Sequence, residues 1–157
     1  YNRAEGEAET IAPDELIYLL VDIVSKNGNL LLDVGPQADG TIPPVQMSRL
    51  EALGSWLGQN GEAIYGTHPW ERAAGKTSGG IEVRFTAKGN SVYATLLGKP
   101  AGTTLTLKSF TPKASSKLSL LGLAKQLSWS QHGDDTVIDL PSTLPGQYAY
   151  VVKLIQP

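Results

Sequence analysis

A short apolar run at residues 30–34 is the feature that most restricts what this chain can fold into. It lies in the stretch NGNLLLDVGPQADGT, residues 27–41, where turn-forming residues enclose it on both sides. A run of this length between turn signals predicts a strand at residues 29–34 that is buried on both faces. Such a strand belongs in a parallel sheet and needs a paired neighbour along each edge. The first half of the chain offers no such neighbour, so the missing strands are expected upstream of Tyr1.

Apolar residues at helical spacing flank this run on both sides. Pro13 and the two acidic residues after it suit the first turn of a helix, because proline fits the first position and carboxylates favour the positive end of the dipole. This helix is expected to end at Asn27, with Gly28 as a left-handed cap. A second helix is expected to begin at Pro43-Pro44 and to end at Asn60-Gly61. Its predicted buried face comprises Met47, Leu50, Leu53, Gly54 and Leu57.

The second half of the chain changes to a period of two. Apolar and polar residues alternate over residues 81–86, which is typical of a half-exposed strand. The spacing of the later strands predicts an antiparallel sandwich that follows a linker at residues 67–80. The predicted fold class is therefore α/β followed by all-β, with domains at residues 1–72 and 73–157. The later strands are expected at residues 92–97, 103–107, 117–121, 127–130, 136–140 and 147–155.

Charge is divided unevenly between the two halves. Residues 1–70 hold three basic and ten acidic residues, and residues 71–157 hold ten basic and five acidic residues. The lysines of the basic half are scattered singly without an aromatic RNA motif, which disfavours nucleic-acid binding and favours a surface complementary to the acidic half. The chain has no cysteine and two separated histidines, so disulfides are excluded and no metal site is expected. No apolar run approaches the length of a membrane span.

Several stretches of the first half together resemble one enzyme family. They are YNR at residues 1–3, LVDIVSKNGNLLLDVGP at 20–36, DGTIP at 39–43, RL and GSWL within 49–57, NGEAIYGT at 60–67 and PW at 69–70. They resemble the α-L-fucosidases of glycoside hydrolase family 29, densely over residues 16–72 and more weakly over residues 73–157. The resemblance implies the last part of a (β/α)8-like (TIM) barrel, whose last strand is residues 29–34, followed by an antiparallel β-sandwich.

The resemblance also implies a reaction, the retaining hydrolysis of terminal α-L-fucose from glycans or glycoconjugates. In this family an Asp attacks the anomeric carbon and a Glu serves as acid and then base. Both residues, and the histidines that hold fucose, lie in barrel segments upstream of Tyr1. Neither His68 nor His132 matches them. No catalytic residue is therefore expected in this chain, which alone should be inactive.

The same resemblance implies the partners of the chain. They are a fucosylated glycan and the missing N-terminal region of the barrel, without cofactor, nucleic acid or membrane, and homo-oligomerisation is left open. A periplasmic, secreted or lysosome-like location is favoured. Because a sandwich has its own core, residues 73–157 are expected to fold alone, whereas residues 1–72 are expected to be ordered only against the barrel or a partner chain.

Asp33 is the one candidate substrate-binding residue of the chain. The family commonly has Asn at this position. Asp33 shares a face of the predicted strand with Asn29 and Leu31 and lies near its C-terminal end, where barrel enzymes gather their chemistry. One interpretation is a carboxylate beside the substrate. The other, which we favour, is a structural hydrogen-bond acceptor for neighbouring loops.

The other candidates have structural interpretations that we favour over functional ones. Asp39-Gly40 and Asp134-Asp135 are expected in turns. Trp56 and Trp70 are expected to pack between domains, Glu62 to be a cap or surface residue, and the role of Trp129 stays open.

A rival hypothesis is a non-catalytic β-sandwich that binds carbohydrate and has a helical leader. The apolar run and the patterned second helix disfavour it, because a leader needs neither. A third interpretation, which we prefer for residues 73–157, is a sandwich that only supports the barrel, because no aromatic row follows one face of its strands.

Overall fold

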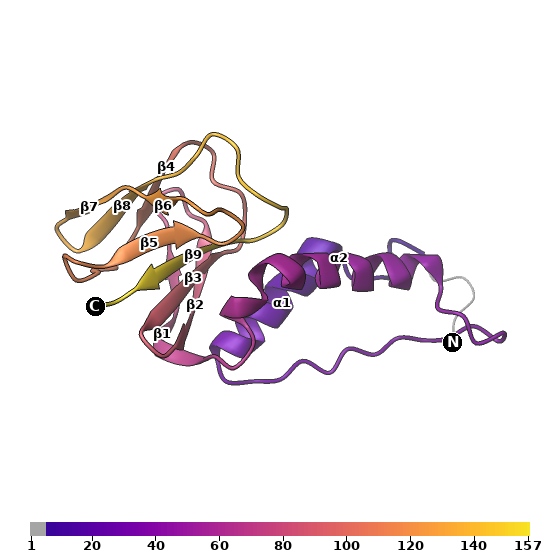
Figure 1. Ribbon diagram of the computed structural model, residues 1–157. Coiled ribbons are helices and arrows are strands. Elements are labelled where there is room, and N and C mark those ends of the chain that lie inside the picture. Colours follow the sequence, from indigo (N-terminus) through magenta and orange to yellow (C-terminus); the bar gives the residue numbers. More distant parts are fainter. Residues whose placement is uncertain (1–5) are drawn as a thin grey trace.

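The computed structural model describes residues 6–157, so the YNR stretch lies outside the described residues. Within this part, two helices come first and an antiparallel β-sandwich follows (Figure 1). None of the described helices is long and apolar enough to cross a membrane. The elements are α1 (Pro13–Ser25), α2 (Pro44–Asn60), the 3-10 helix η1 (Gly61–Ala63), β1 (His68–Lys76), β2 (Glu82–Lys88), β3 (Ser91–Leu96), β4 (Thr104–Leu107), β5 (Lys117–Leu120), β6 (Gln126–Leu127), β7 (Trp129–His132), β8 (Asp135–Asp139) and β9 (Tyr150–Ile155).

The described strands form two sheets, whose strand pairs are all antiparallel. The larger sheet has the order β1-β2-β3-β9-β5-β6, and the smaller one has the order β4-β8-β7. The prediction of an antiparallel sandwich is confirmed. Two details of it are wrong. The expected linker at residues 67–80 contains β1, which pairs with β2, and the expected strand at residues 127–130 is divided between β6 and β7 of different sheets.

The sandwich core lies between the two sheets. Alternate residues of β3 and β9 point into it, together with apolar residues of β2, β4, β5 and β8. Trp70 on β1 packs against Phe85 and Phe110, with ring centroids 5.0 and 5.6 Å away, so it belongs to this core and not to an interdomain contact as expected. Trp129 also packs against the core, and its indole N–H donates to the Ser116 carbonyl at 3.3 Å.

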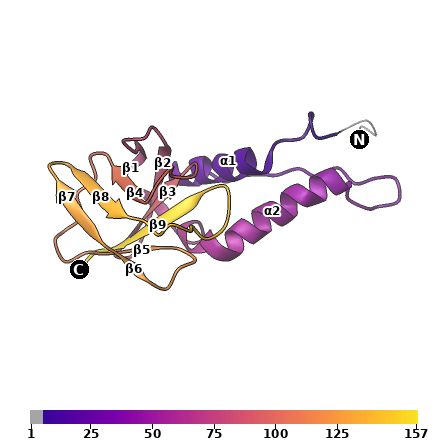
Figure 2. The same cartoon turned by 90° about the horizontal axis from the view of Figure 1, so that it is seen from above.

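The outer face of the larger sheet is covered by α1 and α2. All six residues of β3 are buried, which requires cover on both faces of the strand. Tyr93 of β3 and Val151 of β9 pack on this outer face against Ile17 and Val21 of α1 and Trp56 of α2. The described strands pair only with one another, as expected, while the outer face of the larger sheet is covered by the helices, so the independent folding of residues 73–157 stays a prediction. The helices are ordered against the sheet itself (Figures 1 and 2).

Polar residues of β2 also meet the helices instead of solvent. Arg84 forms an ion pair with Asp22 of α1 at 2.5 Å, and Thr86, which is buried, donates its hydroxyl to the Ala63 carbonyl at 2.8 Å. The expected alternation is confirmed over residues 82–85, where the polar residues are half-buried and the apolar ones buried, but it fails at Thr86, because a polar side chain can dock a helix as well as face water. The Asp22–Arg84 pair joins the acidic half to the basic half, as the charge division indicated.

The C-terminus of α1 shows why Asn27-Gly28 follows it. Asn27, and not Gly28 as expected, has the left-handed conformation, with φ 67°. The N–H of Gly28 bonds to the Ile23 carbonyl at 2.9 Å and that of Asn27 to the Val24 carbonyl at 3.0 Å, which is a Schellman motif. A Cβ at Gly28 would lie 2.8 Å from Cγ2 of Ile23, so glycine is needed here for close approach.

Helix α2 buries its predicted face only in part, because Leu53 and Leu57 pack against the cluster beneath the helix and are half-buried. Its buried residues are Arg49, Trp56 and Asn60, while Met47 and Gly54 are exposed. Arg49 anchors the first half of the helix, because its Nε donates to the Ile11 carbonyl at 2.9 Å and its Nη2 pairs with Glu7. Within the predicted stripe, the described residues leave Met47 and Gly54 exposed and Leu50 half-buried.

The expected strand at residues 29–34 is not formed. The segment is extended, and none of its backbone groups bonds to another described residue. A strand exists only through a paired neighbour, and no other segment of the described chain lies beside this one as a partner. The expected burial on both faces is not formed by the described residues either, since residues 30, 32 and 34 are half-buried and residues 29, 31 and 33 are exposed.

Candidate functional site

Asp33 lies on the exposed face of the extended segment between α1 and α2. Leu31, which shares this face, is 95% exposed. Within residues 6–157 the Asp33 carboxylate makes no hydrogen bond, so the donors expected for it from neighbouring loops are not supplied by this part of the chain. The segment is fixed at its C-terminal end, where the Gly35 N–H donates to Oε1 of Gln46 on α2 at 2.8 Å.

The paired and turn-associated carboxylates have the structural roles expected of them. Oδ1 of Asp39 accepts hydrogen bonds from the N–H of Thr41 at 3.0 Å and from its hydroxyl at 2.7 Å, and Gly40 has φ 83°, which together form a turn. Asp134 lies in the hairpin between β7 and β8, after Gly133 with φ 59°. Among the described residues no group of three His, Cys, Asp or Glu side chains could hold a metal ion.

Trp56 has the packing role that the sequence indicated. It is 4% exposed, and its indole N–H donates to the Ala149 carbonyl at 2.9 Å. Ala149 immediately precedes β9, so this hydrogen bond ties α2 to the larger sheet. The ring is therefore unavailable as an exposed sugar platform.

Glu62 of η1 is the centre of a polar cluster that also contains Tyr93 and Lys153. Its carboxylate accepts a hydrogen bond from the Tyr93 hydroxyl at 2.8 Å and pairs with Lys153 of β9. The bond from Lys153, followed by that from Tyr93, holds the pKa of Glu62 below its usual value. Burial, reinforced by the Glu62 carboxylate, raises the pKa of Tyr93 to about 12. The sequence showed Glu62 only as a cap or surface residue.

A Glu62→Gln variant is expected to lose part of the stability of the protein at neutral pH. A carboxyl whose pKa is lowered by folding contributes stability above its unfolded pKa, and this contribution disappears as pH falls through the folded pKa. Because Glu62 is 44% exposed, we expect a difference below about 1 kcal/mol at pH 7 that vanishes toward pH 3. Urea unfolding of both proteins across this range measures it, and a difference that grows at low pH would contradict the prediction.

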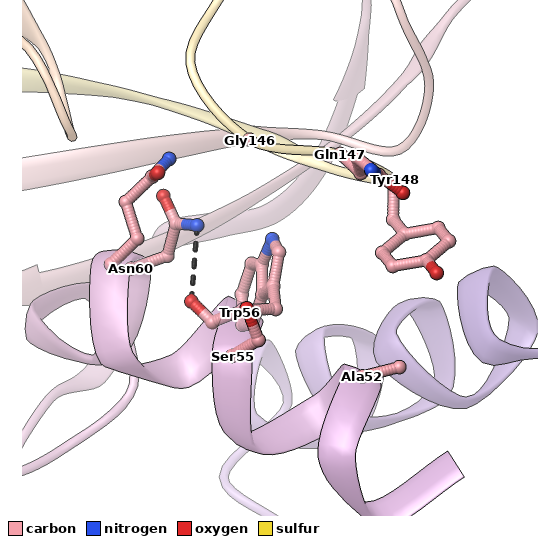
Figure 3. Close-up of a pocket in the computed structure, with 8 residues that line it drawn as sticks. Ala52, Ser55, Trp56, Asn60, Gly146, Gln147 and Tyr148 are labelled. Carbon is pink, nitrogen blue, oxygen red and sulfur yellow. Dashed lines mark hydrogen bonds between the residues drawn. The ribbon is translucent and has the colours of Figure 1, made fainter. Parts of the chain in front are cut away.

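A pocket of about 210 Å³ lies where α2 meets the segment that leads into β9 (Figure 3). One wall comes from α2 and the other from residues 146–148. Nothing in the sequence indicated this pocket. Its two walls are nearly ninety residues apart in the chain, and none of its residues is an Asp, Glu, His, Lys or Cys that would suggest a catalytic acid or base. The lining residues are Ala52, Ser55, Trp56, Gln59, Asn60, Gly146, Gln147 and Tyr148.

Two family models match consecutive parts of the chain. The model described as α-L-fucosidase matches residues 1–62, and the model described as the α-L-fucosidase C-terminal domain matches residues 78–155. Among curated relatives, human tissue α-L-fucosidase is 38% identical over 98% of this chain, and the mouse tissue enzyme is 40% identical over 97%. Each alignment covers 34% of the relative, so this chain spans about a third of the length of these relatives.

Solved structures give the same result. The structure titled Thermotoga maritima α-fucosidase in complex with fucose aligns with a TM-score of 0.92 at 40% identity, over 99% of this chain and 37% of that one. A structure of α-L-fucosidase isoenzyme 1 from Paenibacillus thiaminolyticus aligns with a TM-score of 0.77 at 30% identity, over 95% of this chain and 35% of that one. Proteins with these names are glycoside hydrolases. This chain belongs to the α-L-fucosidase family.

Proposed function

We propose that the whole protein is a retaining α-L-fucosidase that hydrolyses terminal α-L-fucose from glycans or glycoconjugates. One observation carries the proposal. Relatives named α-L-fucosidases align along nearly all of this chain at 38–40% identity, through the helical half as well as the sandwich. A helical leader of an unrelated sugar-binding module would not align in this way. The nucleophilic Asp and the acid/base Glu are then supplied upstream of Tyr1.

In this proposal residues 1–72 are the last part of a (β/α)8-like barrel and residues 73–157 are the sandwich that follows it. Support comes from the order of the elements, which is α1, the extended segment at residues 29–34 and then α2. The two helices lie side by side, and the extended segment leads from the end of α1 back toward the start of α2 (Figure 1). The unbonded backbone of residues 29–34 fits a strand that pairs on both edges with strands outside this chain. Met47, which is exposed, and Leu50, which is half-buried, would pack against the same barrel.

The proposal is tested with a chimera in which residues 1–157 replace the aligned part of the Thermotoga maritima α-fucosidase. We expect the chimera to hydrolyse an aryl α-L-fucoside at least about 10³-fold faster than the Thermotoga protein truncated before that part. The 157-residue chain alone is expected to show no turnover. A folded chimera no faster than the truncated protein, or turnover by the chain alone with contaminating enzyme excluded by mass, would contradict the proposal.

Asp33 is proposed as the residue of this chain nearest to bound substrate, because it lies toward the end of the segment that would face the barrel mouth. Asp33→Asn in the chimera is expected to change kcat/KM by less than about threefold, because relatives commonly carry Asn and the chemistry belongs to other carboxylates. Asn29→Asp, on the same face but at the other end of the segment, is the matched control. A loss of several orders of magnitude in a folded Asp33→Asn chimera would assign Asp33 a catalytic role.

A further inference from the structure

The pocket between α2 and residues 146–148 is lined without a single charged side chain. Its polar groups are amides and hydroxyls, from Gln59, Asn60 and Gln147 and from Ser55 and Tyr148. Its apolar surface comes chiefly from Trp56 and from the Tyr148 ring. Amides and hydroxyls beside aromatic carbon suit a neutral molecule that carries several hydroxyl groups, whereas a phosphate or carboxylate would find no cation here.

Asn60 provides a buried acceptor in this pocket that nothing else in the described chain satisfies. The residue is 1% exposed, and its Nδ2 donates to the Trp56 carbonyl at 3.2 Å. Its Oδ1 has no hydrogen-bond partner. In Figure 3 the Asn60 side chain rises from α2 toward residues 146–148. A buried carbonyl oxygen left without a donor costs roughly 1–3 kcal/mol, so a donor from a bound molecule or water is expected at this point.

The wall opposite α2 is held in a fixed shape. Gly146 and Tyr148 both have positive φ, 75° and 67°, and for the tyrosine this conformation carries backbone strain. The Tyr148 carbonyl accepts a hydrogen bond from the Tyr18 hydroxyl at 3.2 Å, and the Pro145 carbonyl accepts one from Nε2 of Gln59 at 3.3 Å. Contacts from both helices therefore hold this strained segment in place, and the pocket is formed before any molecule enters it.

We propose that this pocket binds a neutral polyhydroxylated molecule the size of one monosaccharide ring. A ring hydroxyl would donate to Oδ1 of Asn60, and the apolar carbons of the ring would lie against the half-buried Tyr148 ring. The volume of about 210 Å³ is far larger than the roughly 10–15 Å³ that one water molecule needs in the same measure, so it has room for one small ring. The inference rests on residues of this chain alone and does not depend on the proposed hydrolase activity.

The test is a titration of the isotopically labelled 157-residue chain with L-fucose and with D-galactose, followed by NMR. Saturable shifts are expected for the side-chain amide of Asn60, the indole N–H of Trp56 and the backbone N–H of Tyr148, with a dissociation constant in the millimolar range. D-Glucuronate, which carries a carboxylate, is expected to bind at least about tenfold more weakly than D-galactose.

Ala52→Leu fills the pocket from its α2 wall and is expected to weaken binding at least about tenfold. Glu51→Leu is the matched control, because it adds the same side chain at the adjacent exposed position, which does not line the pocket. Binding retained in Glu51→Leu and lost in Ala52→Leu supports the proposal. Shifts that never saturate, or equal binding by both variants, would overturn it and leave ordered water as the only occupant. These outcomes are independent of whether the chimera is active.

Discussion

Replacing Trp56 with alanine is expected to lower the free energy of unfolding of the 157-residue chain by about 3–5 kcal/mol. Trp56 is 4% exposed and lies in the cluster where α1 and α2 meet the outer face of the larger sheet. Removal of the ring leaves a cavity between three elements, and the Ala149 carbonyl loses its hydrogen bond from the indole N–H. Urea unfolding followed by far-UV circular dichroism measures the change.

Two further variants separate the causes of this loss. Trp56→Phe keeps most of the ring volume and removes the N–H, so its expected cost is about 1–2 kcal/mol. Met47→Ala, on the same helix but at a 39% exposed position, is expected to cost below about 1 kcal/mol. If Trp56→Ala cost no more than Met47→Ala, α2 would not be docked on the sheet through this residue.

The strands of the sandwich could be predicted because their signal is local. Alternation and turn residues fix a strand wherever it pairs, so the segments at residues 92–97, 103–107, 117–121 and 136–140 agree closely with β3, β4, β5 and β8. The same local reasoning placed both helices and the hairpin at Asp134. It needed no knowledge of which sheet each strand joins.

The faces of the elements were harder to predict, because burial depends on partners that are remote in sequence. Arg84 and Thr86 on β2 are polar, which indicated solvent, yet they contact Asp22 and Ala63. On α2 the buried positions include the polar Arg49 and Asn60, while Met47 of the predicted apolar stripe is exposed. Hydropathy alone cannot distinguish a polar residue that docks a helix from one that faces water.

The apolar run at residues 29–34 shows a different limit. Its composition correctly indicated an extended segment, but burial of both faces and strand pairing depend on neighbouring segments, and no described residue pairs with this one. The pocket could not be predicted from the sequence for the same reason, because Asn60 and Tyr148 come together only in the folded chain. Nothing near either residue in the sequence signals the other.

A fragment of residues 67–157, with both helices removed, is expected to lose the stability of the sandwich. Removal of α1 and α2 exposes Tyr93, Ala149 and Val151 together on the outer face of the larger sheet. An exposed apolar sheet face of this kind promotes self-association. The ion pair of Arg84 with Asp22 and that of Lys153 with Glu62 are lost as well, which leaves two cations without their partners.

Thermal unfolding and sedimentation of this fragment, beside the 157-residue chain, measure the effect. We expect the fragment to associate or to unfold more than about 10 °C below the longer chain, since each kcal/mol corresponds to about 4–8 °C in a domain of this size. Replacing Tyr93 and Val151 with threonine in the fragment should reduce association, because threonine keeps β-propensity and removes apolar surface. In hydrogen exchange, the amides of residues 30–33 should exchange rapidly in the longer chain, because their backbone groups are unbonded. A monomeric fragment with the melting temperature of the longer chain would show that the sheet does not depend on the helices that cover it.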